Sequence, residues 1–131
     1  MKQSLSKIAL LVRDYDEAIQ FYVKKLSFDL VEDTPMDEGK RWVVVKPKGA
    51  KNDCCLLLAK AKNEEQLQFV GNQTGGRVFL FLYTDNLERD YQNLIQHHIT
   101  IIRPISAEVY GKVLVFADLY GNLWDLIQPS K

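Results

Sequence analysis

Features that mark several common functional classes are scarce in this sequence of 131 residues. Its 17 basic and 17 acidic residues cancel to a formal net charge of zero. No stretch gathers Lys and Arg on one side of a helix, as nucleic-acid binding requires. No apolar run is long enough for a membrane span, and none near the first residue has the length of a signal peptide. We therefore expect a cytoplasmic protein that binds neither nucleic acid nor a membrane.

Cysteine and histidine are also rare, with two residues of each. Cys54 and Cys55 are adjacent in the apolar run CCLLLA. This position favours buried thiols in a strand over a disulfide or a metal-binding knuckle. His97 and His98 follow a predicted helix, where exposed capping residues are common. Neither pair predicts a metal site by itself.

Apolar residues, in contrast, make up 47% of the chain, enough for a buried core. Their periodicity predicts helices at 14–26 and 86–98 and a short helical segment at 64–70. A first group of strands is predicted at 6–12, 28–33, 41–47 and 54–60. A second group is predicted at 77–84, 100–105, 111–118 and 122–128.

The predicted elements form one βαβββ module followed by another. The strand-to-helix corners LLVRDYDEAIQFY and FLYTDNLERDYQNL show the repeat, with a displacement of roughly 71–72 positions. The sequence predicts an α+β fold in which two curled mixed sheets enclose a cleft. It forms a single domain over 1–131, with repeats at about 1–70 and 77–131. A ferredoxin-like βαββαβ fold is the rival, but it does not use all eight predicted strands.

The corner IALLVRDYDEAIQFYVKKLSF and the ending VFADLYGNLWDLIQ carry a more specific signal. They resemble the opening and closing signatures of the vicinal oxygen chelate superfamily, the group of glyoxalases, bleomycin resistance proteins and extradiol dioxygenases. The resemblance covers nearly the whole chain and implies the paired βαβββ fold. It also implies a homodimer, since small members commonly pair two chains. The scaffold serves lyases, isomerases, dioxygenases, thiol transferases and drug-sequestering proteins, so function must be argued from the site.

The resemblance also locates the metal ligands of metal-dependent members, which lie on the first and last strand of each module. The matching positions here are Lys7, the segment 55–59, Val78 or Phe79, and Asp125. A protonated lysine has no lone pair to donate, and the third position is apolar. One aspartate is too few for a divalent metal. The sequence therefore predicts that the usual metal site is lost and that no cofactor is needed.

Asp125 remains to be explained, because it interrupts an apolar strand. Strand alternation turns it to the face opposite Trp124 and Leu126, which point toward the helices. The same alternation turns Lys7 into the cleft, and the resemblance brings these two positions together. We expect Lys7 to stand where relatives hold the cation and to form an ion pair with Asp125. The alternative is that both face solvent at the mouth of the cleft.

Other residues are candidates for contacting a ligand in the cleft. One strand alternates three aromatic residues onto one face, which suits flat or apolar ligands unless they fill a core: Phe79, Phe81 and Tyr83. Three more residues lie at the starts of strands, where guanidinium groups beside rings suit planar or anionic ligands, or where they are simply solvated: Arg41, Trp42 and Arg77.

Three functional hypotheses remain open. The first is a protein that binds a small aromatic molecule in the cleft without a metal, and loss of the metal ligands favours it. The second is an enzyme of the same superfamily, such as a glyoxalase-like lyase, an isomerase or a dioxygenase. Lys7, Asp125 and Tyr110, in the loop before the penultimate strand, would then transfer protons. The third is an unconventional metal site that includes Asp125 and Cys55.

Overall fold

The computed structural model describes residues 1–50 and 54–131. The chain forms two compact units, Met1–Val70 and Gly71–Lys131. The first unit contains β1 (Lys7–Val12), α1 (Tyr15–Ile19), η1 (Gln20–Lys25), β2 (Asp29–Pro35), η2 (Asp37–Gly39), β3 (Arg41–Lys46), β4 (Cys55–Lys60) and α2 (Glu64–Phe69). The second contains β5 (Val78–Tyr83), α3 (Leu87–Gln96), β6 (Ile101–Glu108), β7 (Gly111–Ala117) and β8 (Leu123–Pro129).

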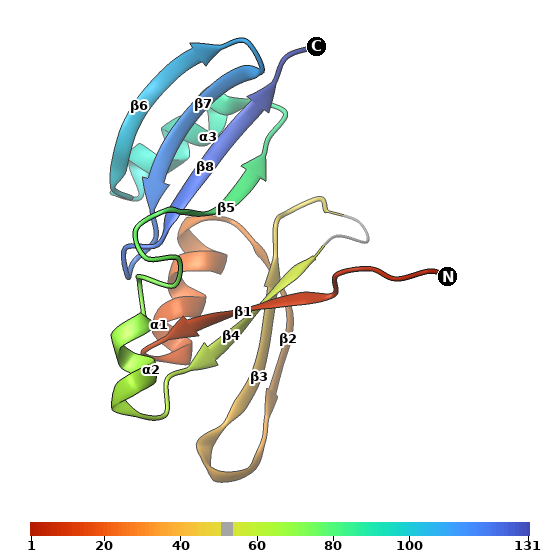
Figure 1. Cartoon of the computed structure of the whole chain (residues 1–131), viewed down its shortest axis with the longest axis vertical. Helices are drawn as coiled ribbons and strands as arrows, with labels where there is room; N and C mark the ends of the chain where they lie inside the picture. The colour runs from red at the N-terminus through yellow and green to blue at the C-terminus, as the bar shows by residue number, and fades with distance from the viewer. Residues whose placement is uncertain (51–53) are drawn as a thin grey trace. The chain divides into compact units, whose positions relative to one another are not determined.

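Both units contain a four-stranded mixed sheet with the same topology (Figure 1). The strand order is β1-β4-β3-β2 in the first sheet and β5-β8-β7-β6 in the second. In each sheet the first strand runs parallel to the last, and the other neighbours are antiparallel. The predicted α+β fold with two βαβββ modules is therefore confirmed.

The core of the first unit lies on the helix side of its sheet. Leu10 of β1 and Leu58 of β4 are fully buried neighbours, and Val43 of β3 lies beside Leu58. Asp14 caps α1 by accepting a hydrogen bond from the Glu17 backbone N–H at 2.8 Å. Beyond Ile19 the predicted helix continues as the π-helix η1, which the apolar periodicity did not indicate.

The core of the second unit is an aromatic and leucine layer between its sheet and α3. Trp124 of β8 and Phe116 of β7 are buried and stacked, with ring centroids 5.9 Å apart. Gln128 of β8 accepts a hydrogen bond from the Leu87 backbone N–H at 2.8 Å, which ties the start of α3 to the sheet. At the other end His97 is the C-cap residue of α3, in agreement with the expected capping role.

The length and composition of the helices also bear on membrane association. Across residues 1–50 and 54–131, no helix combines the length and apolar character needed to cross a membrane.

Candidate functional site

The second sheet has one face turned away from α3, which we call its open face. Pairing across the four strands places Phe81 beside Asp125, Asp125 beside Val115, and Val115 beside Arg103. Cross-strand partners point to the same side of a sheet, so these residues form one row on the open face. We call this row, consisting of Phe81, Asp125, Val115 and Arg103, the Asp125 row.

Aromatic residues dominate the β5 side of this face. The Phe81 residue is 64% exposed, and Tyr83, two residues along the same strand, is 71% exposed. Ile127, the neighbour of Tyr83 on β8, is buried, and Val115 on the next strand, β7, is buried as well. Two exposed rings next to a packed aliphatic floor form a surface that a flat apolar molecule could cover.

The electrostatics of the row centre on Asp125. Partial burial raises the pKa of the Asp125 carboxyl above its usual value, and the positive charge of Arg103 partly opposes this rise. Among the residues of the second unit, 71–131, neither side chain has a hydrogen-bond or ion-pair partner. Both polar groups therefore remain able to bind a ligand.

Arg103 was not among the residues that the sequence singled out. Counting back along β6 from the Val109–Tyr110 hairpin loop would place Pro104 opposite Val115. The register of β6 and β7 shifts between Arg103 and Ser106, and this shift places Arg103 there instead. The strand TIIRPI gave no sequence signal for the shift.

The remaining candidates of the second unit lie outside the Asp125 row. Phe79 falls at a register shift between β5 and β8. Tyr110 lies on the hairpin loop beyond Gly111, and Gly111 is four residues, about 14 Å, along β7 from Val115. Arg77 lies in the glycine-rich loop before β5.

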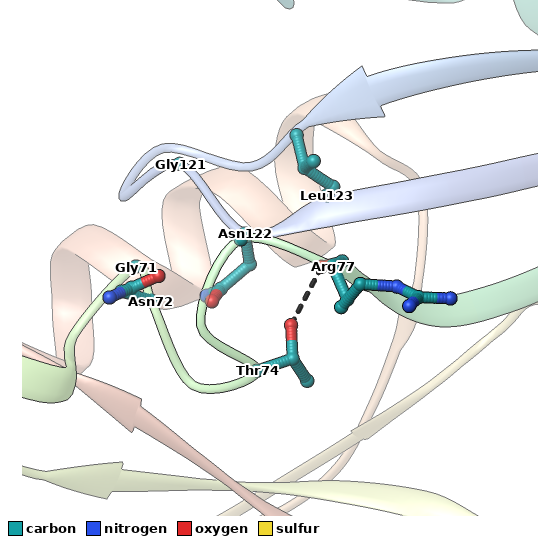
Figure 2. A pocket seen from close by; sticks show the side chains of 8 residues that line it. Gly71, Asn72, Thr74, Arg77, Gly121, Asn122 and Leu123 are labelled. Carbon is teal, nitrogen blue, oxygen red and sulfur yellow. Dashed lines mark hydrogen bonds between the residues drawn. The ribbon is translucent and has the colours of Figure 1, made fainter.

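A hollow of about 130 Å³ lies beside Arg77, and Figure 2 shows the residues that line it. Its lining consists of Gly71, Asn72, Thr74, Gly76, Arg77, Gly121, Asn122 and Leu123. The Asn122 side chain points into the curve of the loop, whereas the Arg77 guanidinium extends away from it. Ligand pockets usually measure about 300–1,000 Å³, so we interpret this hollow as a junction between the loop and the turn before β8.

Buried polar contacts hold that turn in place. The Asp118 Oδ1 atom accepts hydrogen bonds from the backbone N–H groups of Tyr120 and Asn122, each at 2.9 Å. The Asn122 side-chain amide donates to Asp118 Oδ2, also at 2.9 Å. The buried polar groups of Asp118 and Asn122 therefore have their hydrogen-bond partners within the turn itself.

In the first unit the three candidates divide between the two faces of the sheet. Lys7 and Trp42 alternate onto the face of the first sheet that is turned away from its buried core, and there Lys7 donates a hydrogen bond to Ser6 Oγ at 3.0 Å. Arg41 lies on the helix side and forms ion pairs with Asp16 at 2.8 Å and Asp33 at 2.7 Å. Its guanidinium therefore already has two carboxylate partners. Lys7 and Asp125 belong to different units, and the ion pair between them stays a prediction.

The matching rows of the two sheets identify the residues at the metal-ligand positions. In the first sheet the equivalent row is Ala9, Leu57, Val44 and Glu32, so Leu57 occupies the place of Asp125. Cys55 lies beside Lys7 on the same face and is half-buried, not fully buried as the sequence predicted.

These residues do not fit a divalent metal. Leu57 has no donor atom, and a protonated Lys7 is a cation. Nowhere in the described part of the chain, 1–50 and 54–131, do three His, Cys, Asp or Glu side chains group as metal ligands would. The hypothesis of an unconventional metal site that includes both Cys55 and Asp125 stays a prediction.

The repeated fold and these positions define a class of protein, and sequence comparison agrees. Residues 4–126 match the family model of the Glyoxalase/Bleomycin resistance protein/Dioxygenase superfamily. The chain belongs to this superfamily.

Particular relatives extend the comparison. An uncharacterized protein of Shewanella frigidimarina (strain NCIMB 400) is 59% identical over 129 residues, 98% of this chain and 95% of that protein. The crystal structure of UcmS2 is similar with a TM-score of 0.83 at 27% identity, and covers 97% of this chain and 98% of that chain. TnmS3, an antibiotic binding protein from Streptomyces sp. CB03234, is similar with a TM-score of 0.78 at 29% identity, over 98% of both chains.

Proposed function

We propose that this protein binds a small aromatic molecule on the open face of its second sheet, without a divalent metal. The observation that carries this proposal is the exposure of Phe81 and Tyr83, at 64% and 71%, on the same face as a partly buried carboxyl group. Exposed aromatic residues beside polar groups are typical of small-molecule sites.

The structurally similar TnmS3 supports this proposal, since it is an antibiotic binding protein. Antibiotic binding by a protein of the same fold requires only recognition, which suits a site without metal ligands. The identity of 29% does not carry the ligand of TnmS3 over to this chain. The proposal therefore rests on the residues of the open face.

An enzyme is the second candidate, and the raised pKa of Asp125 favours it. A carboxyl group whose pKa moves toward neutral pH becomes a better general acid or base. Asp125 would then transfer a proton for a lyase, an isomerase or a dioxygenase that acts on a small metabolite. Tyr110, in the hairpin loop before Gly111, lies about 14 Å or more from the row along the direction of β7.

Fluorescence titration with 2-naphthol and 2-naphthoate tests the binding function. We expect Phe81→Ala to weaken binding of both probes by about tenfold, because stacking area is lost. The matched control is Phe69→Ala in α2, which removes an aromatic residue that is 48% exposed in the first unit and should change the Kd less than about twofold.

A chelator separates binding from metal-dependent chemistry in the same assay. Excess EDTA should leave the Kd of both probes unchanged. Loss of binding with EDTA, equal losses in the two Phe variants, or no binding by either probe would contradict the proposed function.

A further inference from the structure

We propose that the Asp125 row selects planar aromatic ligands that carry a hydrogen-bond donor at one end of the ring system and an anionic group at the other. This inference rests on the proposed function and adds the chemical class of its ligand. The donor end would lie at Asp125 and the anionic end at Arg103.

The spacing of the row matches such a ligand. Asp125 and Arg103 lie on β8 and β6, with Val115 of β7 between them. Neighbouring strands are about 4.8 Å apart, so the two Cα atoms are separated by about 10 Å. Val115 is buried beneath its neighbours and places no further polar side chain between the two polar groups. A fused two-ring molecule fits this distance with one substituent near each end.

The charges then discriminate between ligands. A wholly apolar ring would cover a carboxylate and a guanidinium without offering either a partner, which is costly. A ligand with only a cationic group is repelled by Arg103, and one with only an anionic group is repelled by Asp125. A donor and an anion on one molecule satisfy both groups, and the guanidinium suits a planar carboxylate.

Other charge on this face is remote from the row. The register puts Glu108 on the open face opposite Gly111, four residues or about 14 Å along β7 from Val115. Its carboxylate already accepts a hydrogen bond from the Ser106 hydroxyl at 3.1 Å. Among the described residues of the second unit, Asp125 and Arg103 are therefore the charged groups that lie beside Val115.

The first sheet shows that the fold itself does not require this pair. At the equivalent positions it has Leu57 in place of Asp125 and Glu32 in place of Arg103. Glu32 accepts a hydrogen bond from the Thr34 hydroxyl at 2.9 Å. The same row can thus be built with an aliphatic residue in place of the acid. Folding of the sheet therefore does not explain why the second sheet has Asp125 and Arg103.

Isothermal titration at pH 7.5 with three naphthalenes tests the inference. We expect 6-hydroxy-2-naphthoate to bind at least about tenfold more tightly than 2-naphthoate or 2-naphthol, since each lacks one of the two polar groups. Asp125→Leu, which copies the first sheet, should make 6-hydroxy-2-naphthoate and 2-naphthoate bind alike. Arg103→Met should remove the advantage of 6-hydroxy-2-naphthoate over 2-naphthol.

Lys112→Met is the matched control, because it removes an exposed cation from the opposite side of β7. It should change all three Kd values less than about twofold. Thermal unfolding of each variant checks that the fold is retained. Similar Kd values for the three compounds, with binding still sensitive to Phe81→Ala, would overturn this inference and leave the proposed function standing. No binding by any compound would overturn both.

Discussion

Asp125 illustrates at the scale of one residue how a candidate site lowers stability. Its pKa is raised in the folded chain, so the folded state holds the proton more tightly than the unfolded state does. The free energy of unfolding therefore falls as the pH rises from the usual aspartate pKa of 3.8 through the higher folded value. At neutral pH the charged carboxylate is a destabilising group.

Asp125→Asn should consequently stabilise the protein at pH 7, by about 1 kcal/mol or less because the group is only partly buried. The gain should shrink as the pH falls and should disappear below about pH 3.8, where both states are protonated. Urea unfolding at pH 7 and pH 3.5 measures the difference. A variant that is less stable than the natural protein at pH 7 would contradict this explanation.

Gly71 presents a steric constraint at the same scale. Its φ is +81°, and an added Cβ would lie 1.9 Å from the Tyr120 carbonyl oxygen. We expect Gly71→Ala to lower the free energy of unfolding by about 3 kcal/mol or more, from positive φ and the backbone clash together. Urea unfolding of the variant and of the natural protein measures this loss of unfolding free energy.

Gly49→Ala is the control for Gly71→Ala. Gly49 has the same φ of +81°, but no atom of the described residues, 1–50 and 54–131, lies within 4 Å of its added Cβ. It should therefore cost only the conformational term, about 1–2 kcal/mol. Equal losses in the two variants would show that the contact with Tyr120 carries no energy.

At the scale of elements, Arg41 joins three parts of the first unit. Its guanidinium lies between Asp16 of α1 and Asp33 of β2, and 5.2 Å from the centroid of the Tyr15 ring. The hydrogen bond from Arg41 holds the pKa of the Asp33 carboxyl below its usual value. Asp33 therefore stabilises the fold above pH 3.8 and loses this effect as the pH falls through its lowered folded pKa.

Asp33→Asn should destabilise the protein at pH 7 by about 0.5–1 kcal/mol, a modest value because solvent screens the pair. The sign is opposite to that expected for Asp125→Asn. Urea unfolding at pH 7 and at pH 2 follows the effect, which should become smaller at the lower pH. A stabilising effect at pH 7 would show that the ion pair between Asp33 and Arg41 does not hold β2 and β3 together.

The elements themselves were largely predictable from the sequence, because alternating and helical apolar patterns report burial directly. All eight predicted strands are present, with bounds that differ by a few residues. Register is harder to predict, since slipping a strand by one residue leaves its pattern intact. For this reason the alternating pattern placed Phe81 and Tyr83 on one face of a strand, but the sequence gave no sign of Arg103.

For the whole molecule, the donor set at the four ligand positions leads to a prediction on metal content. We expect well under one Zn, Ni, Mn or Fe ion per purified chain, because Leu57 and a protonated Lys7 supply no ligands. Elemental analysis of protein purified without chelators measures this. About one ion per chain, lost in Asp125→Ala, would instead support the unconventional metal site.

Assembly also belongs to this scale. Each sheet ends in outer strands, β1 and β2 in the first and β5 and β6 in the second, whose outward backbone groups gain from being covered. We predict a homodimer, so light scattering at micromolar concentration should give about twice the chain mass of 15.1 kDa. A mass equal to one chain would refute it.

The register shift beside Phe79 has an evolutionary consequence. Ahead of it Val78 pairs with Leu123, and beyond it Phe81 and Tyr83 share the open face with Asp125. Phe79 is the extra residue at this shift. Deleting it would leave Val78 beside Leu123, Leu80 beside Trp124 and Phe81 beside Asp125, so both rings would stay on the open face. If all the residues of β5 paired without the shift, Phe81 and Tyr83 would instead turn toward α3. A relative that has lost one codon at this point would therefore still present the aromatic surface.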